Sequence, residues 1–299
     1  MRRRYLSATR LGITIFWLLA LTPKAQGSKF AVGPEAPEAR DCASTQQTGN
    51  ALAGQVMPFE LGSGFLIVVE GRIGTLTSLR FALDTGTTHS VMDAKIAARL
   101  RLARKEGLVL NFDRDVQVSW TNVPELQVGP LTLRDVRMMV GELRQLTDFA
   151  EGIDGVIGMD VLRMSCRMTI NFETMRVTFR TDSRSRQLTS GSPQALLVRL
   201  EAQGEPLRLV LDTGARDIFL FEDRIRSHTK RLEWKQHVSN AWEGTMKGKI
   251  AQRLGLRLGT TELKDSAFLM EMAPSSLPAE IDGYLGLSVF EREICRTGF

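Results

Sequence analysis

The sequence predicts a mainly β protein built from two copies of one fold, with only short helices. The tripeptide Asp-Thr-Gly occurs at 84–86 and at 212–214, and each copy directly follows a short apolar run. A second motif, Asp-Gly-apolar-apolar-Gly, ends 74 residues after each of these aspartates, at Gly158 and Gly286. Much of the remaining chain consists of short apolar segments bounded by turn residues, as expected for strands.

The equal spacing of the two motifs indicates an internal duplication. Asp84 and Asp212 lie 128 positions apart, and the glycines that end the second motifs are separated by the same distance. Between the motifs, 126–140 resembles 256–270 at an offset of 130, a drift that changes in loop length explain. A single Asp-Thr-Gly is an ordinary strand-to-turn sequence. Two copies in register predict that the halves are related by a pseudo-two-fold axis within one chain and bring two aspartates together.

Within the first half, the sequence predicts two hairpins and a helix. Residues 65–69 and 79–83 form the first hairpin, and 171–179 forms one that closes the half. Asp93 is a suitable N-cap for a helix over 94–102.

The second half repeats the first hairpin and the helix. Residues 196–200 and 207–211 form the equivalent hairpin, and 222–232 is a weaker helix candidate. Asp154 and Asp282 also recur in the second motifs, where an Asp before Gly is most simply a turn residue.

The N-terminus is typical of an export signal. Arg2, Arg3, Arg4 and Arg10 precede an apolar run of about 11 residues, and small residues follow near Ala25. We therefore predict a signal peptide at 1–27 and an exported protein, periplasmic or extracellular. An uncleaved anchor is the alternative, although spanning a bilayer takes roughly 20 apolar residues. The sequence holds no second long apolar segment, so no membrane span is expected once the signal is removed.

Changes in composition predict where the two lobes and their linkers begin and end. Residues 28–55 are rich in Ala, Gly, Pro, Gln and Thr, and they are predicted to form a linker or a removable pro-segment. The two lobes are predicted at 56–181 and 194–299. A linker rich in Ser, Arg and Thr joins them at 182–193.

Charge and composition exclude several functions. The net charge of +5 comes from the first 27 residues, and the remainder holds 34 basic and 34 acidic residues. Nucleic-acid binding is therefore not expected. The three histidines show no metal-ligand spacing, so neither a metal nor a cofactor is expected. Among the three cysteines, Cys166 and Cys295 occupy related places, and they either form a bridge or remain buried thiols.

Two carboxyl groups that share one proton can hydrolyse a peptide bond without a metal. The ionised carboxyl takes a proton from water, and the neutral one polarises the carbonyl. Asp84 and Asp212 are the candidate catalytic pair. The glycines that follow allow sharp turns with amide groups near the carboxylates, and the threonine hydroxyls can bond to the opposite loop. The supporting residues are Thr85, Gly86, Thr213 and Gly214.

The complete pattern resembles the retropepsin-like aspartic peptidases over about Met57 to Phe299. The matching segments are 84–87 with 157–160, and 212–215 with 285–287. Retropepsins usually pair two chains, so the resemblance implies a tandem, single-chain, two-lobe member of bacterial type. It further implies β-barrel-like lobes and a peptide or protein substrate. We expect a monomer, with a homodimer as the alternative.

The resemblance also implies a flap about 25 residues after each triplet. In the second half, 240–248 contains Trp242 and Gly244 and has the glycines of a mobile hairpin tip. In the first half, 111–122 contains Trp120 but no glycine, which predicts a stiffer or degenerate flap. Both tryptophans either touch substrate or pack in the core. After Phe290 no closing hairpin is predicted, so a strand that the family often uses to join its halves is expected to be missing.

The sequence therefore predicts an aspartic endopeptidase that activates water between Asp84 and Asp212. The alternative is a non-catalytic peptide-binding or scaffold protein that retains the fold.

Overall fold

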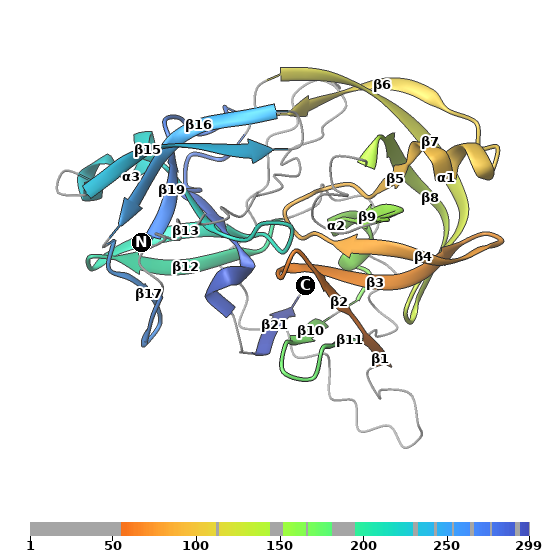
Figure 1. Ribbon diagram of the computed structural model, residues 1–299, viewed down its shortest axis with the longest axis horizontal. Coiled ribbons are helices and arrows are strands. Elements are labelled where there is room, and N and C mark those ends of the chain that lie inside the picture. Colours follow the sequence, from red (N-terminus) through yellow and green to blue (C-terminus); the bar gives the residue numbers. More distant parts are fainter. Residues whose placement is uncertain are drawn as a thin grey trace, which may run out of the picture.

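The computed structural model describes residues 55–111, 114–143, 152–165, 167–180, 195–229, 233–241, 244–252, 254–263, 266–275, 277–290 and 294–298. Within these ranges the chain forms three sheets of eight, nine and four strands, with few and short helices (Figure 1). The predicted mainly β class is confirmed. The predicted signal peptide and interlobe linker, and all of the predicted N-terminal linker except Gln55, lie outside the described residues.

The eight-stranded sheet belongs to the first half. Its strands are β2 (Glu60–Gly62), β3 (Leu66–Ile73), β4 (Leu76–Leu83), β5 (Val91–Asp93), β6 (Lys105–Asn111), β7 (Arg114–Val128), β8 (Leu131–Gly141) and β9 (Gly155–Ile157). They are ordered β2-β3-β4-β9-β5-β8-β7-β6. Helix α1 (Ala94–Arg99) begins at the predicted cap, because Oδ1 of Asp93 accepts the N–H of Lys95 at 2.9 Å. A second helix, α2 (Met159–Leu162), follows β9.

The nine-stranded sheet belongs to the second half. Its strands are β12 (Leu197–Ala202), β13 (Glu205–Leu211), β14 (Ile218–Phe221), β15 (Glu233–Ala241), β16 (Gly244–Gln252), β17 (Leu256–Leu258), β18 (Thr261–Glu262), β19 (Ser266–Met270) and β20 (Gly283–Leu285). They are ordered β15-β16-β19-β14-β20-β13-β12-β17-β18. The weaker helix candidate is present as α3 (Glu222–Thr229), and a 3-10 turn, η3 (Leu287–Phe290), follows β20.

The two large sheets repeat the same strand pairings. The order β3-β4-β9-β5-β8-β7-β6 in the first half corresponds to β12-β13-β20-β14-β19-β16-β15 in the second. In both halves, the strand before Asp-Thr-Gly runs parallel to the strand of the second motif. In the first half, β5 pairs antiparallel with β9 and parallel with β8. In the second half, β14 pairs antiparallel with β20 and parallel with β19. The fold is therefore consistent with two duplicated lobes.

The third sheet joins the halves and corrects one prediction. It consists of β1 (Gln55–Pro58), β11 (Arg176–Arg180), β10 (Arg167–Asn171) and β21 (Ile294–Gly298), in that order, and it lies at the bottom of Figure 1. Strand β21 pairs antiparallel with β10, with Arg296 opposite Thr169. The prediction that the second half lacks a joining strand is wrong. A single strand paired with the other half carries no turn signal, so a search for a hairpin misses it.

The same sheet bears on two smaller predictions. Strands β10 and β11 form the predicted closing hairpin of the first half. Cys295 lies in β21 opposite Ile170, whereas Cys166 lies outside the described residues, so the cysteine pairing stays open.

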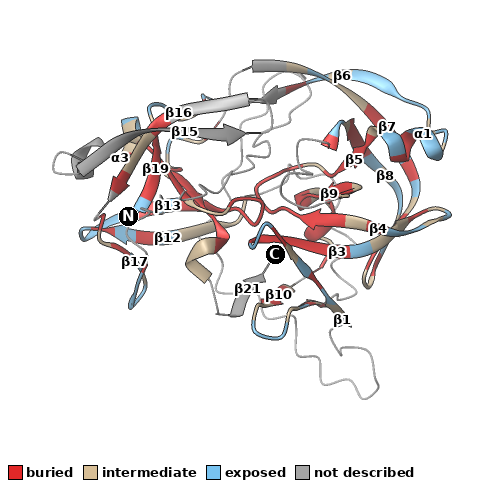
Figure 2. Ribbon diagram, viewed as in Figure 1, coloured by how far each residue is buried: buried red, intermediate tan, exposed pale blue. Residues whose placement is uncertain are grey.

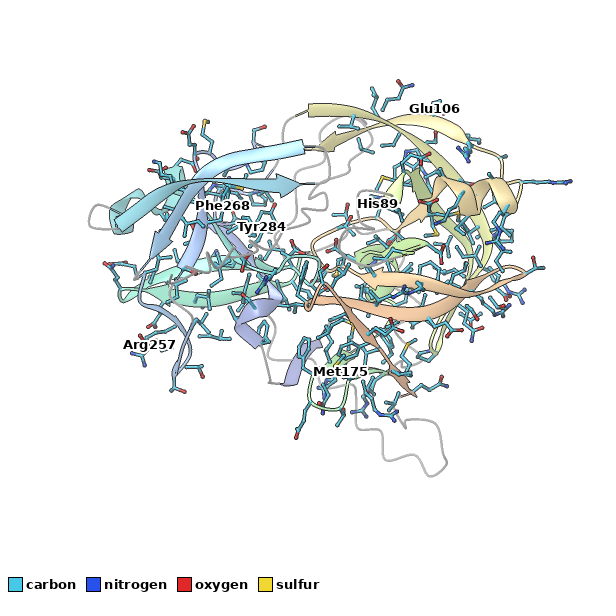
Figure 3. The ribbon with its side chains drawn as sticks, in the orientation of Figure 1. His89, Glu106, Met175, Arg257, Phe268 and Tyr284 are labelled. Atoms are coloured by element: carbon cyan, nitrogen blue, oxygen red, sulfur yellow. The ribbon has the colours of Figure 1, made fainter. Side chains whose placement is uncertain are left out.

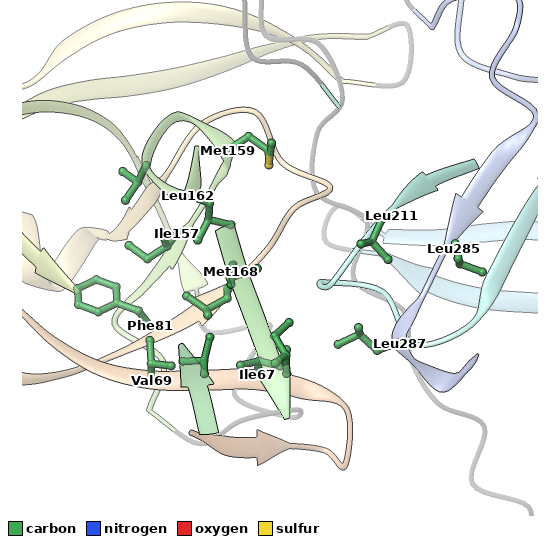
Figure 4. Close-up of a cluster of buried hydrophobic side chains, with 14 of the residues drawn as sticks. Ile67, Val69, Phe81, Ile157, Met159, Leu162, Met168, Leu211, Leu285 and Leu287 are labelled. Carbon is green, nitrogen blue, oxygen red and sulfur yellow. The ribbon is translucent and has the colours of Figure 1, made fainter. Parts of the chain in front are cut away.

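The strands that lead to the two Asp-Thr-Gly loops are buried at their ends. Figure 2 shows this burial along β4 and β13 toward the middle of the molecule. One apolar cluster includes residues of both halves, with Phe81 and Ile157 on one side and Leu211 and Leu285 on the other (Figure 4). Full burial of side chains of this size contributes about 1.5–3 kcal/mol each. This core gives both loops a rigid base.

Candidate active site

The two Asp-Thr-Gly loops meet between the halves and bring Asp84 and Asp212 together. The aspartates are 1% and 0% exposed, and their carboxyl groups lie within hydrogen-bonding reach of each other. In each loop the N–H of the glycine donates to Oδ1 of the aspartate of the same triplet, at 2.8 Å from Gly86 and 2.9 Å from Gly214. The turn of each loop thus orients its own carboxylate.

The two threonines tie the loops to each other. The N–H of Thr85 donates to Oγ1 of Thr213 at 3.0 Å, and the N–H of Thr213 donates to Oγ1 of Thr85 at 3.1 Å. Each hydroxyl then donates to a carbonyl of the opposite strand, from Thr85 to Leu211 at 2.7 Å and from Thr213 to Leu83 at 2.8 Å. These four buried bonds fix the separation of the two aspartates.

Gly86 and Gly214 are required because each lies against the opposite carboxyl group. A Cβ atom added at Gly86 would lie 2.5 Å from Oδ1 of Asp212. One added at Gly214 would lie 2.5 Å from Cγ of Asp84. No side chain fits at either position while the aspartates face each other.

The second motifs support the loops from behind. The N–H of Asp84 donates to the carbonyl of Ile157 at 3.0 Å, and the N–H of Asp212 donates to that of Leu285 at 3.0 Å. A Cβ at Gly158 would lie 2.8 Å from the carbonyl carbon of His89. The absence of a side chain therefore allows this segment to pack against the loop, as the sequence predicts.

Asp154 and Asp282 have structural contacts of the kind that the turn interpretation predicts. Oδ2 of Asp154 accepts the N–H of Arg80 at 3.0 Å. At the equivalent place, Oδ2 of Asp282 accepts the N–H of Arg208 at 2.8 Å. These bonds connect the second motif to the strand that carries the loop.

Burial makes both aspartates weak acids. Desolvation raises the pKa of Asp84 to about 7, although hydrogen bonds such as that from Gly86 oppose the shift. Desolvation also raises the pKa of Asp212 well above its usual range, and the neighbouring charge of Asp84 raises it further. Two like charges this close do not ionise together, so the pair holds one proton over a broad pH range.

Two long hairpins, β6–β7 and β15–β16, point toward each other from opposite halves in the upper part of Figure 1. The first is regular as far as the pair of Asn111 and Arg114, which excludes a degenerate hairpin and leaves the stiffer flap as the remaining alternative. Backbone pairing along β6 and β7 needs no glycine at the tip. In the second hairpin, Gly244 pairs with Ala241, and Trp242 lies outside the described residues.

Trp120 packs at the base of the first hairpin and is 8% exposed. Its ring meets the His89 ring edge-on at 5.2 Å, and the guanidinium of Arg137 lies 4.2 Å from its centroid. Gly107 makes room on β6, where a Cβ would lie 2.8 Å from Nε1 of Trp120. These contacts are those of a packed residue, the second of the two alternatives for Trp120.

His89 is a neighbour of the site that the sequence did not indicate. Figure 3 labels it in the first half, and its Nδ1 lies 2.9 Å from Oγ1 of Thr88. Burial lowers its pKa to about 4, and the charges of Arg137 and Arg163 add to the effect. Its place three residues after Gly86 is the signal in the sequence, because a residue so near the triplet lies in the same loop.

The described residues contain no group of side chains suited to a metal ion and no helix suited to a membrane. Among the residues that the structure describes, no three or more His, Cys, Asp or Glu side chains are grouped to hold a metal ion. In the same part of the chain, no helix is long and apolar enough to cross a membrane.

A family model described as "gag-polyprotein putative aspartyl protease" matches residues 69–164, which include the first Asp-Thr-Gly and Gly158. This segment is similar to a retropepsin-like aspartic peptidase. Among solved structures, a retropepsin-like aspartic protease from Rickettsia conorii is 12% identical, with a TM-score of 0.32. That match covers 46% of this chain and 100% of the other. No curated protein sequence matches the chain significantly. The family-model match thus supports the predicted resemblance to aspartic peptidases over residues 69–164.

Proposed function

We propose that the protein is an aspartic endopeptidase with Asp84 and Asp212 as its catalytic pair. The observation that carries the proposal is the meeting of two buried aspartates from matched Asp-Thr-Gly loops of one chain. Their raised pKa values support the sharing of one proton near neutral and acidic pH. A pair with one proton has both the base and the acid that the reaction needs.

Hydrolysis would proceed without a covalent intermediate. The ionised carboxyl takes a proton from water, and the oxygen of that water attacks the peptide carbonyl carbon. The protonated carboxyl donates a hydrogen bond to the carbonyl oxygen, where negative charge develops. A proton then passes to the amine as the C–N bond breaks, and the pair returns to its starting state. The glycine N–H groups and the threonine bonds keep the carboxylates in place during these steps.

The test is hydrolysis of an unstructured peptide library between about pH 3 and 7, the range over which such carboxyls titrate. Asp84→Asn and Asp212→Asn are expected to lower kcat/KM by roughly 10²–10⁴-fold, because each removes one proton-transfer group. Asp154→Asn is the matched control and is expected to keep activity, because an asparagine oxygen can still accept the N–H of Arg80 and the residue is not one of the pair. A pepstatin-type inhibitor is expected to block the reaction. If the wild-type protein cleaves nothing, or if both Asn variants stay active, the proposal fails.

A non-catalytic peptide-binding protein is the rival function. It would bind extended peptides with equal affinity before and after replacement of the aspartates, and it would release them intact. Retention of both complete triplets favours turnover, because the loss of one aspartate would suffice to abolish it. Mass spectrometry of the bound peptides separates the two functions.

The proposed active species is a monomer, because both aspartates come from one chain. Equal specific activity on dilution, with a sedimentation mass of one chain, would support this, and activity confined to a dimer would exclude it. We also propose export to the periplasm or beyond, which rests on the N-terminal pattern alone. Cell fractionation and N-terminal sequencing of the recovered protein test it, and a cytoplasmic protein that starts at Met1 would contradict it.

A further inference from the structure

The loops that carry the two aspartates are attached to the second motifs by two equivalent backbone bonds. We call residues 84–90 the first loop and residues 212–218 the second loop. In the first half, the N–H groups of Met159 and Asp160 donate to the carbonyls of Thr87 and Thr88, at 2.9 and 3.2 Å. In the second half, the N–H groups of the two residues after Gly286 donate to the carbonyls of Ala215 and Arg216, at 2.9 and 2.8 Å.

The third attachment differs between the halves. In the second half, the N–H of Gly286 donates directly to the carbonyl of Asp217 at 3.1 Å. In the first half, the N–H of Gly158 donates instead to the hydroxyl of Ser90 at 3.0 Å. That hydroxyl donates onward to Oδ1 of Asp160 at 2.7 Å. A side-chain relay thus replaces a direct backbone bond.

Two further contacts complete the relay. The N–H of Ser90 donates to both carboxylate oxygens of Asp160 at 3.0 Å. The carbonyl of His89, equivalent in position to that of Asp217, accepts the hydroxyl of Thr87 at 3.2 Å. The relay therefore consists of Thr87, Ser90 and Asp160.

The second half has no side chains that can form this relay. The equivalent residues are Ala215, Ile218 and Ser288. Ala215 and Ile218 are apolar and buried, at 0% and 1% exposure. All three positions therefore differ between the halves, as expected if each half holds its loop by a different set of hydrogen bonds.

Burial makes the relay sensitive to the loss of any member. Thr87 and Ser90 are 0% exposed, so water does not readily replace a lost partner. The carboxylate of Asp160 receives Ser90 N–H, Ser90 hydroxyl and, at 2.9 Å, the N–H of Val161. Donors from the loop and from α2 thus converge on this one carboxylate.

We propose that Asp160 is a positioning residue that holds the first loop, and with it Asp84, through Ser90. It holds the first loop directly, whereas the equivalent residue of the second half is Ser288 and supplies no carboxylate. The inference rests on the proposed peptidase function for its kinetic consequence, but the positioning itself is independent of turnover.

The test replaces Asp160 by the residue found at the equivalent place in the other half. Asp160→Ser is expected to lower kcat by roughly 10- to 100-fold with KM nearly unchanged, because a small displacement of Asp84 weakens the chemical step. Ser90→Ala is expected to lower kcat in the same direction but by less, because it removes the hydroxyl and leaves the backbone N–H of residue 90 bonded to Asp160. The double variant is expected to lose little more than Asp160→Ser alone, since the hydroxyl acts through the same carboxylate. Ser288→Ala is the matched control and is expected to leave kcat within about twofold, because its attachment to the second loop is made by its backbone N–H.

Two more measurements separate positioning from folding and from the proposed function. Val177→Ala removes buried apolar atoms elsewhere in the first half and serves as a control for general loss of stability. If this variant loses as much kcat as Asp160→Ser at equal loss of Tm, the positioning role is overturned.

The titration of the aspartate pair, followed by carboxyl-carbon NMR, needs no turnover. Its apparent pKa values are expected to change in Asp160→Ser and to stay constant in Ser288→Ala. An unchanged titration in Asp160→Ser overturns the positioning role. If the wild-type protein cleaves no peptide, the proposed function fails, and the NMR comparison still decides the role of Asp160.

Discussion

The hydroxyl oxygen of Thr85 accepts the backbone N–H of Thr213 at 3.1 Å, and the reverse bond is 3.0 Å long. Thr85→Ala and Thr213→Ala each remove one hydroxyl that both accepts and donates a buried hydrogen bond. For each variant we expect a loss of about 1–3 kcal/mol in the free energy of unfolding and a lower kcat. Thr85→Ser and Thr213→Ser keep the hydroxyl and are expected to restore most of both. Chemical denaturation and peptide hydrolysis measure the effects. Ala variants as stable and active as the Ser variants would show that these bonds do not hold the loops together.

The aspartate pair is expected to make the protein less stable as pH rises. A carboxyl whose pKa is higher in the folded state than in the unfolded state stabilises fully below the unfolded value, and this contribution is lost as pH rises through the folded value. For Asp84 the window runs from 3.8 to about 7. We expect the wild-type Tm to fall, relative to that of an Asp84→Asn and Asp212→Asn double variant, by at least about 4 °C between pH 4 and 8. Parallel Tm profiles for the two proteins would contradict the raised pKa values.

His89 is expected to have the opposite effect. Its pKa is lowered from 6.5 to about 4, so its contribution is present above pH 6.5 and is lost as pH falls through the folded value. The cause is burial, together with the charges of Arg137 and Arg163. His89→Phe removes the titrating group while keeping a ring beside Trp120. Its Tm is expected to fall less than that of the wild type between pH 6.5 and 4, and an equal fall would count against a buried neutral histidine.

Gly86→Ala and Gly214→Ala are expected to abolish activity. In each variant the new methyl group would overlap the opposite carboxyl group, so the loops must move apart. Gly259→Ala is the comparison, because a Cβ there meets nothing within 4 Å and only the positive φ of 59° is unfavourable. It should cost about 1–2 kcal/mol of stability and leave kcat unchanged. Activity in Gly86→Ala would show that the loops are not packed this closely in solution.

Removal of residues 294–299 is expected to loosen the connection between the halves. Without β21, the backbone groups of β10 that pair with it lose their partners, and the halves stay connected near the aspartates by the threonine bonds and the shared apolar cluster. We expect a lower Tm and a large loss of activity. Addition of a peptide that covers 291–299 is expected to restore part of the activity. A truncated protein with full activity would assign β21 no role in the site.

The fold and the site were predictable from sequence to different extents. Asp84 and Asp212 stand out because local motif and constant spacing agree, and the helix cap at Asp93 is a local signal. Strand β21 has no such signal, since its partner lies more than a hundred residues away. The Ser90–Asp160 bond joins residues 70 positions apart, so neither residue indicates the other. The burial of Trp120 depends on Gly107 across the hairpin, a relationship that register alone reveals.

The joining of both halves in one chain has a genetic consequence. In a symmetric homodimer each substitution appears twice, so a change that suits one loop must also suit its copy. Here Ser90 and Ile218 occupy equivalent places and need not match. A gene of this kind can alter the surroundings of one aspartate while the other stays as it was. Selection can then act on the surroundings of each aspartate separately.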